Sequence, residues 1–176
     1  MNLNIWVRLI LTFASKYWRS KIKITGLCYT PFRVMFTDLD LNFHMNNARY
    51  FALMDIARLD FLQRTGLIKT IKSNKWYPVV ADETISFGKS LDLFDKVNIV
   101  TKIEGWDDKF IYLEQTFERN EETVAGGIVK SCIMSKQGPV PTQKIMSEIG
   151  FDQKKLELSN WIKEWSKGRK PLLRRI

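Results

Sequence analysis

Histidine and cysteine are scarce in this chain of 176 residues, which contains one histidine, His44, and two cysteines, Cys28 and Cys132. Two cysteines cannot build a disulfide framework or a cysteine-rich zinc site. A single histidine also excludes a metal site made of clustered imidazoles. Internal repeats and low-complexity tracts are missing as well. We therefore expect reduced thiols, no metal and no cofactor.

The composition is typical of one folded globular domain. Hydrophobic residues make up 45% of the chain and charged residues 27%, which excludes a mostly disordered chain. The length suffices for one hydrophobic core and is short for two. Aromatic residues reach 12%, including six tryptophans, and predict a well-filled interior or a pocket for an apolar ligand.

The net charge of +9 is unevenly distributed. Residues 1–24 carry five basic groups and no acid, and residues 167–176 carry five more, again without an acid. The remainder has 18 basic against 19 acidic groups. A nucleic-acid-binding domain normally carries its basic stripe on the folded body, so no nucleic-acid partner is expected. The pattern favours termini that touch an anionic surface such as lipid head groups, with solubilising tails as the alternative.

The first 20 residues predict a basic amphipathic helix, within a segment bounded at 1–24. Apolar side chains recur there at three- and four-residue spacing: Trp6, Leu9, Ile10, Phe13 and Tyr17. The stretch is interrupted by Arg8 and is shorter than the roughly 20 residues that cross a bilayer. No secretory cleavage site is evident. Two interpretations stay open: the helix packs on the domain or its dimer partner, or it lies in a membrane interface.

The rest of the pattern predicts an α+β domain at 25–140 and a helical extension with a basic tail at 141–176. Apolar residues occur nearly all round a helix expected at 48–64 and closed by Gly66, so that helix should be buried on most sides. Such a helix requires a sheet that curves around it. Runs typical of strands occur at 27–37, 77–89, 95–106, 109–119 and 123–136. Gly126 and Gly127 indicate a bulge or a close backbone approach in the last strand.

Unusual polar residues are concentrated in the loop at 37–47, directly before this helix. Two carboxylates, the only histidine and three asparagines lie there. Asparagine favours helix caps, so one interpretation is that Asn46 or Asn47 merely satisfies the first free amides of the helix. The other interpretation is that the loop carries catalytic groups.

The spacing Asp40-x-Asn42-x-His44-x-x-Asn47, followed by Ala48, resembles the active-site loop of hotdog-fold acyl thioesterases of the 4-hydroxybenzoyl-CoA thioesterase-like type. The segments LDLNFHMNNARYFALMDIARLDF and GWDDKFIYLEQTFER are similar to two blocks of a thioesterase-like branch. The resemblance implies a hotdog fold: a curved antiparallel sheet around one long central helix, here with extra N- and C-terminal helices. It also implies a homodimer or a dimer of dimers, with active sites at the subunit interface.

The resemblance further implies that the chain hydrolyses an acyl-CoA to free acid and coenzyme A without a metal. Asp40 would act as general base or as nucleophile. The helix N-terminus at Asn47 and Ala48 would form the oxyanion hole, while Asn42 and His44 would orient water, the substrate carbonyl or Asp40. A thiolate leaves readily because thiols have a pKa of about 8.5, so no strong general acid is needed.

Other residues near this loop or in the strands have less specific patterns. Phe87 and Lys89 are candidate substrate-binding residues, with Lys89 expected to meet a coenzyme A phosphate; an exposed lysine without a role is the alternative. Asp38 is expected to be a turn or surface carboxylate. Glu83, on a strand that should face the helix, is a candidate partner for Asp40.

Three functions follow from these observations. The leading hypothesis is a homodimeric acyl-CoA thioesterase, located in the cytoplasm or peripherally at the inner membrane surface. The second is hydration or dehydration of an acyl thioester. The third is a non-catalytic acyl- or lipid-binding protein held at a membrane surface by its basic ends.

Overall fold

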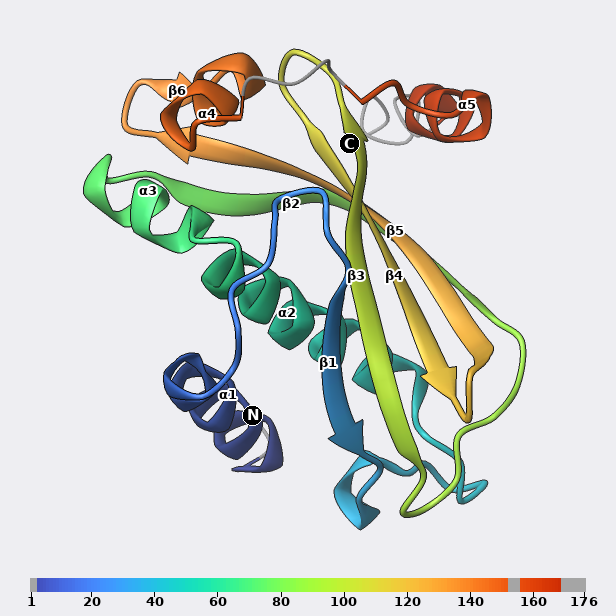
Figure 1. The fold of residues 1–176 in the computed structure, drawn as a ribbon. Helices are drawn as coiled ribbons and strands as arrows, with labels where there is room; N and C mark the ends of the chain where they lie inside the picture. The colour runs from blue at the N-terminus through green and yellow to red at the C-terminus, as the bar shows by residue number, and fades with distance from the viewer. Residues whose placement is uncertain (1–2, 152–155, 169–176) are drawn as a thin grey trace.

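One antiparallel β-sheet forms the centre of the protein (Figure 1), in a computed structural model that describes residues 3–151 and 156–168. The strands lie in the spatial order β1 (Cys28–Arg33), β3 (Lys96–Trp106), β4 (Ile111–Arg119), β5 (Glu122–Ser135) and β2 (Tyr77–Phe87). The short strand β6 (Gly138–Pro139) pairs with β5. The sheet curves around the helix α2 (Asn47–Arg64), so the predicted architecture is confirmed. The first strand is shorter than predicted, because the chain turns into a 3₁₀ helix, η2 (Phe36–Asp38).

The central helix α2 begins and ends at its predicted signals. The Ala48 N–H donates to Oδ1 of Asn46 at 2.9 Å, which makes Asn46 the N-cap. Gly66 follows the helix with φ of +83°, a left-handed conformation that glycine adopts without strain, and α3 (Leu67–Ser73) starts there. The apolar side chains of α2 that are at most 2% exposed are Tyr50, Leu53, Met54, Ala57 and Phe61. These side chains make α2 the centre of the core.

At Gly127, β5 lies close to both β2 and α2. A Cβ atom at this position would lie 2.5 Å from the Thr84 carbonyl oxygen on β2 and 3.0 Å from Cε of Met54 on α2. At Gly126 the nearest atom to such a Cβ would be Cγ2 of Thr116, at 3.6 Å. The glycine pair therefore marks a close approach and not a bulge, and only Gly127 is sterically required.

The N-terminal helix α1 (Leu3–Ala14) continues into the 3₁₀ helix η1 (Ser15–Tyr17) and lies beside α2 (Figure 1). Ile5 and Leu9 pack against the core. Helical structure ends before the predicted residue 20, at Tyr17. The helix packs on the domain, but the other apolar side chains predicted to share its buried face are exposed to solvent.

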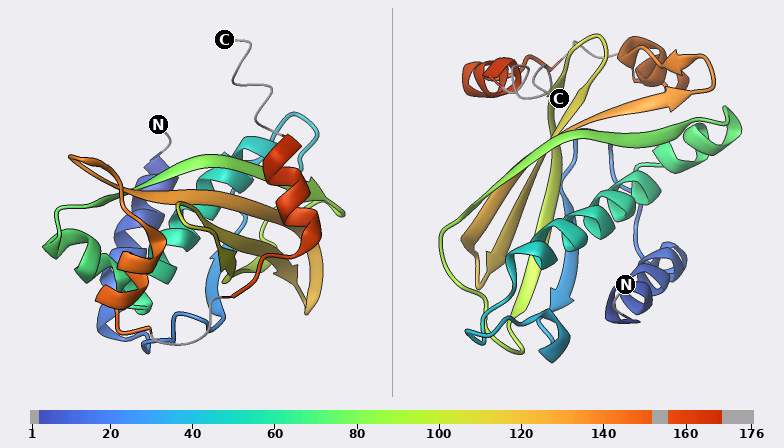
Figure 2. Two further views of the ribbon diagram at one scale, coloured as in Figure 1. Left: turned by 90° about the horizontal axis from the view of Figure 1, so that it is seen from above. Right: turned by 180° about the vertical axis from the view of Figure 1, so that it is seen from behind.

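Two further helices, α4 (Thr142–Glu148) and α5 (Asn160–Gly168), follow the sheet. The fully buried Ile162 of α5 packs on Tyr112 and Ile128, on the outer face of β4 and β5 that is turned away from α2 (Figure 2). Most of the predicted basic tail, residues 169–176, lies outside the described residues. None of the described helices is long and apolar enough to cross a bilayer.

Candidate functional site

A compact loop leads from β1 to α2 and carries the predicted active-site residues. A β-bridge joins Leu39 to Met45, and the Asp40 N–H donates to the His44 carbonyl at 2.9 Å. The Phe43 N–H donates to the Asp40 carbonyl at 3.1 Å. Phe43 has φ of +60°, a left-handed conformation that is uncommon for a bulky residue. These bonds hold Asp40 and His44 opposite each other at the base of the turn.

The Asp40 carboxylate is partly buried, and one of its oxygens is fixed by its own loop. The backbone N–H of Asn42 donates to Oδ1 of Asp40 at 2.8 Å, which forms an Asx turn. The other oxygen, Oδ2, has no hydrogen-bond partner in the part of the chain that the structure describes. Asp40 therefore presents one free oxygen from a fixed position.

His44 pairs with a carboxylate that the sequence pattern did not single out. A β-bridge joins the backbones of His44 and Asp92, and Nε2 of His44 lies 3.8 Å from Oδ1 of Asp92. This distance is within ion-pair range and too long for a hydrogen bond. The two side chains are 49% and 62% exposed, so both remain accessible to a ligand.

The first turn of α2 brings backbone amides to the same region. The Ala48 N–H is occupied by Oδ1 of Asn46, whereas the Asn47 N–H has no acceptor among the described residues. The N-terminus of a helix carries a partial positive charge that favours anions. Asn47 therefore has a free amide for an anionic atom, and the amide of Ala48 is available only if the Asn46 side chain turns away.

The loop, the first turn of α2 and the segment after β2 enclose a pocket of about 310 Å³. The predicted site residues that line it are Asp40, His44, Asn47, Phe87 and Lys89. Asn42 and Ala48, which were also predicted, are exposed neighbours that do not line it. The structure thus brings together residues that lie far apart in the sequence, and we call this the Asp40 pocket.

Four lining residues were missed by the sequence reasoning: Met45, Tyr50, Gly88 and Ser90. In the sequence, Tyr50 is one of several apolar residues of the predicted helix. Its place at the pocket is evident only from its tertiary contacts. Its ring lies 4.9 Å from that of Phe87 and 4.8 Å from that of Phe117, centroid to centroid. Burial raises the pKa of Tyr50 to about 12, so its hydroxyl stays protonated at neutral pH.

Lys89, which lines the Asp40 pocket, forms an ion pair with Glu122. Both side chains are more than half exposed. An exposed ion pair contributes little to stability, so an anionic ligand group can replace Glu122 at small cost.

Asp38 is not a turn or surface carboxylate as predicted. Its side chain is fully buried, and the Arg8 guanidinium of α1 donates to Oδ2 at 2.7 Å and to Oδ1 at 3.3 Å. The Met35 N–H also donates to Oδ2, at 2.9 Å. Asp38 therefore connects α1 to the loop, and it does not belong to the Asp40 pocket.

The predicted pairing of Glu83 with Asp40 is wrong. Oε2 of Glu83 lies 3.4 Å from Nη2 of Arg58, and burial raises the pKa of the Glu83 carboxyl group. Arg58 also donates to Oε1 of Gln115 at 2.8 Å and pairs with Asp55 on its own helix. Glu83 is therefore part of a polar network along α2.

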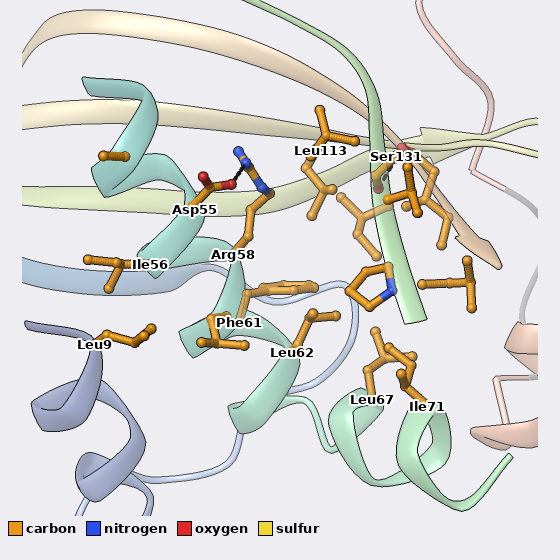
Figure 3. A pocket seen from close by; sticks show the side chains of 18 of the residues that line it. Leu9, Asp55, Ile56, Arg58, Phe61, Leu62, Leu67, Ile71, Leu113 and Ser131 are labelled. Carbon is orange, nitrogen blue, oxygen red and sulfur yellow. Dashed lines mark hydrogen bonds and ion pairs between the residues drawn. The ribbon is translucent and has the colours of Figure 1, made fainter. Parts of the chain in front are cut away.

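A larger cavity of about 510 Å³ runs along α2, between this helix, α3 and the sheet (Figure 3). Most of its wall is aliphatic or aromatic, including Leu9, Ile56, Phe61, Leu62, Leu67, Ile71, Val79, Val80, Ile103 and Leu113. The paired side chains of Asp55 and Arg58 are its main polar groups (Figure 3). This apolar cavity can accommodate a hydrophobic group.

Metal-ligating side chains do not gather at either cavity. Across residues 3–151 and 156–168, no group of three or more His, Cys, Asp and Glu side chains is arranged to hold a metal ion.

Known proteins share both the sequence and the architecture of this chain. The model of the thioesterase-like superfamily matches residues 34–166. Protein THEM6 of Drosophila melanogaster is 35% identical over 144 residues, which cover 77% of this chain and 69% of that protein. The chain spans between 52% and 62% of the length of two further relatives.

Two solved structures illustrate the shared fold. The probable thioesterase YbaW of Escherichia coli has a TM-score of 0.66 at 20% identity, over 72% of this chain and 99% of that chain. The BH1999 gentisyl-coenzyme A thioesterase has a TM-score of 0.61 at 26% identity, over 68% of this chain and 98% of that chain. In both, nearly the whole known structure is matched by the sheet and helix described above.

Proposed function

This chain belongs to the thioesterase-like superfamily and has the hotdog fold, and we propose that it is an acyl-CoA thioesterase that produces a free acid and coenzyme A. One observation carries the proposal: Asp40, His44 and Asn47 line a single pocket with Lys89 at the N-terminus of α2. The similar gentisyl-coenzyme A thioesterase, as its name states, acts on a coenzyme A thioester. That similarity supports the same class of substrate for this chain.

Asp40 is the reactive group in this proposal, as general base or as nucleophile. As a base, Oδ2 takes a proton from a water molecule whose oxygen attacks the thioester carbon. The C–S bond of the tetrahedral intermediate then breaks and coenzyme A leaves as a thiolate. As a nucleophile, Oδ2 of Asp40 instead attacks the thioester carbon, the C–S bond breaks and coenzyme A leaves as a thiolate; water then hydrolyses the resulting acyl anhydride and restores the Asp40 carboxyl group. The bond from the Asn42 N–H to Oδ1 supports either role, because it aims the free oxygen.

The helix N-terminus stabilises the negative oxygen of the intermediate. The free N–H of Asn47 is the donor that we assign, assisted by the partial positive charge of α2. One such donor typically stabilises the transition state by roughly 3 kcal/mol. Ala48 can contribute a second N–H only after its bond to Asn46 is released.

His44 and Asn42 act as positioning groups. The Asp92 carboxylate, 3.8 Å from Nε2 of His44, restrains the imidazole at the rim of the pocket, where it can orient the attacking water or the carbonyl. Asn42 acts through its backbone N–H to Asp40, because its side chain does not line the pocket.

The two ends of the substrate need different surroundings. The apolar cavity along α2 suits an acyl group, because its wall is mostly aliphatic. Lys89 and Phe87 suit the coenzyme A end, where Lys89 would exchange Glu122 for a phosphate. A homodimer would close the open side of the apolar cavity, whose rim includes the exposed edge residues Val79 and Val80 of β2.

The direct experiment compares hydrolysis of an acyl-CoA panel by the wild type and by Asp40→Asn, with a thiol-detecting dye. We expect thiol release by the wild type and a loss of kcat of about 100-fold or more in Asp40→Asn. Glu164→Gln is the matched control, since it makes the same exchange at an exposed site on α5. Equal rates for wild type and Asp40→Asn would remove Asp40 from the mechanism.

The same panel separates the alternative functions. A hydratase would add water to an enoyl-CoA without releasing thiol. A non-catalytic acyl-binding protein would bind acyl-CoA and release nothing. Either result with the wild type would overturn the proposed hydrolysis.

A further inference from the structure

Ile5 and Leu9 of the N-terminal helix pack on the core, but most of its apolar side chains face solvent. Every exposed side chain that the structure describes between Asn4 and Trp18 is apolar: Trp6, Val7, Ile10, Leu11, Phe13, Tyr17 and Trp18. We call these residues the outward face. Their exposed fractions run from 40% for Phe13 to 79% for Tyr17. An amphipathic helix of a soluble domain normally shows the opposite arrangement.

The polar side chains of Asn4 and Arg8 are instead directed at the protein body. Arg8 donates to Asp38, and Asn4 donates to Thr37 at 2.8 Å. Ser15 is buried and donates to the Thr12 carbonyl. Because the bonds of Asn4 and Arg8 fix the rotation of the helix, α1 cannot turn its exposed apolar residues inward without breaking them.

Further exposed apolar side chains lie beyond the outward face, in the segments that follow β1 and precede β3. Val7, Leu11 and Trp18 line one groove of about 420 Å³ together with Met35. Next to Met35, the exposed Phe36 ring packs on the exposed Phe94 ring at 5.6 Å. Many exposed apolar side chains gathered in one region of a chain mark a site of contact with a protein or a membrane.

The charges near this region are positive. Arg33 lines the same groove, and the exposed Lys21 and Lys23 lie on the segment that leaves η1; none of the three has an ion-pair partner within the described residues. The acids that contact this region, Asp38 and Asp60, are fully buried and paired with arginines. The solvent side therefore presents apolar groups bordered by unpaired cations.

We propose that the outward face of α1 and η1 lies in the interface of an anionic phospholipid bilayer. Tryptophan and tyrosine, which the face contains, are suited to the level of the lipid head groups. Bulky aliphatic groups such as Ile10 and Leu11 enter the acyl boundary, and the unpaired cations attract anionic head groups.

A second copy of the chain fits this face less well. A two-fold contact through the outward face would bring the same cations together from both copies, which is unfavourable. A bilayer has no such conflict, because its anionic surface is complementary to them.

The test is flotation of the full chain with vesicles of phosphatidylcholine alone and with about one third phosphatidylserine. The variant Ile10→Asp/Leu11→Asp places charges at side chains that are 62% and 57% exposed. The control is Trp161→Asp on α5, at 55% exposure and on the opposite side of the sheet from α1. Circular dichroism and thermal unfolding verify that all three proteins are folded.

We expect the wild type and Trp161→Asp to bind the anionic vesicles, more weakly at high salt and on phosphatidylcholine alone. The double variant should lose at least about tenfold of the bound fraction. If the wild type does not float with the anionic vesicles, the proposal is wrong. It is also wrong if the double variant binds these vesicles as well as the wild type does. The wild type could instead fail to bind vesicles and sediment as an oligomer, while the double variant sediments as a monomer. In that case the outward face is a contact between copies of the chain and the proposal is wrong.

Discussion

Arg8 and Asp38 join the N-terminal helix to the loop of the Asp40 pocket, because Nη2 of Arg8 lies 2.7 Å from Oδ2 of Asp38. The backbone carbonyl of Asp38 in turn accepts from the N–H of Asn46 at 2.8 Å, and Asn46 caps α2. The position of α1 and the conformation of the loop that holds Asp40 are therefore linked by direct bonds.

This link predicts a large effect for Arg8→Ala. The substitution leaves a fully buried carboxylate without its guanidinium, so we expect the free energy of unfolding to fall by about 3 to 5 kcal/mol. Urea denaturation measures the change. The control Arg33→Ala removes an exposed guanidinium and should change stability by less than about 0.5 kcal/mol. Equal losses in the two variants would contradict the assigned role of the pair.

The close approach at Gly127 predicts that two neighbouring glycines differ. Gly127→Ala forces a methyl group against the Thr84 carbonyl and Met54, so the free energy of unfolding should fall by at least about 2 kcal/mol. Gly126→Ala meets its nearest neighbour at an ordinary distance of 3.6 Å and should be tolerated. Thermal unfolding of both variants provides the comparison. If Gly127→Ala is as stable as the wild type, α2 and β2 do not pack against β5 as described.

Cys28 predicts a pH dependence of stability. Burial, and next the nearby Asp60 carboxylate, raise the pKa of the Cys28 thiol from 9.0 to about 11. Between these values the unfolded thiol has lost its proton while the folded thiol retains it, so stability falls as the pH rises through this range. The stability of the wild type relative to Cys28→Ala should therefore decrease by roughly 2 kcal/mol from pH 9 to pH 11 in urea titrations. A difference that does not vary with pH would contradict the shift.

Lys89 predicts a change in substrate affinity with little change in turnover. Lys89→Ala removes the cation that we expect to meet a coenzyme A phosphate, so KM for acyl-CoA should rise about tenfold and kcat should stay nearly constant. The N-acetylcysteamine thioester of the same acid lacks the phosphates and should be hydrolysed equally by both proteins. Lys69→Ala, at an exposed site on α3, is the matched control. If Lys89→Ala leaves the KM for acyl-CoA unchanged, Lys89 does not contribute to coenzyme A binding.

Local signals in the sequence were sufficient for the elements that position the pocket. The cap at Asn46 and the stop at Gly66 delimit α2, and the loop motif predicts three of the residues that line the Asp40 pocket, namely Asp40, His44 and Asn47. These features depend on neighbours within a few positions, and for that reason they can be read without a structure.

Long-range pairing could not be predicted in the same way. Asp38 with Arg8, His44 with Asp92, and Glu83 with Arg58 each join segments that meet only in the folded chain. The orientation of α1 has the same origin. Helical periodicity identifies which side is apolar, whereas the inward bonds of Arg8 and Asn4 decide which side faces the body.

The helix α5 also limits how copies of this chain can assemble. Its Ile162 is fully buried on the outer face of β4 and β5, against Tyr112 and Ile128. Two sheets stacked back to back through these strands would have to displace α5 and expose that contact. A back-to-back contact through β4 and β5 is therefore disfavoured while α5 is in place, and removal of α5 would expose an apolar surface that favours self-association.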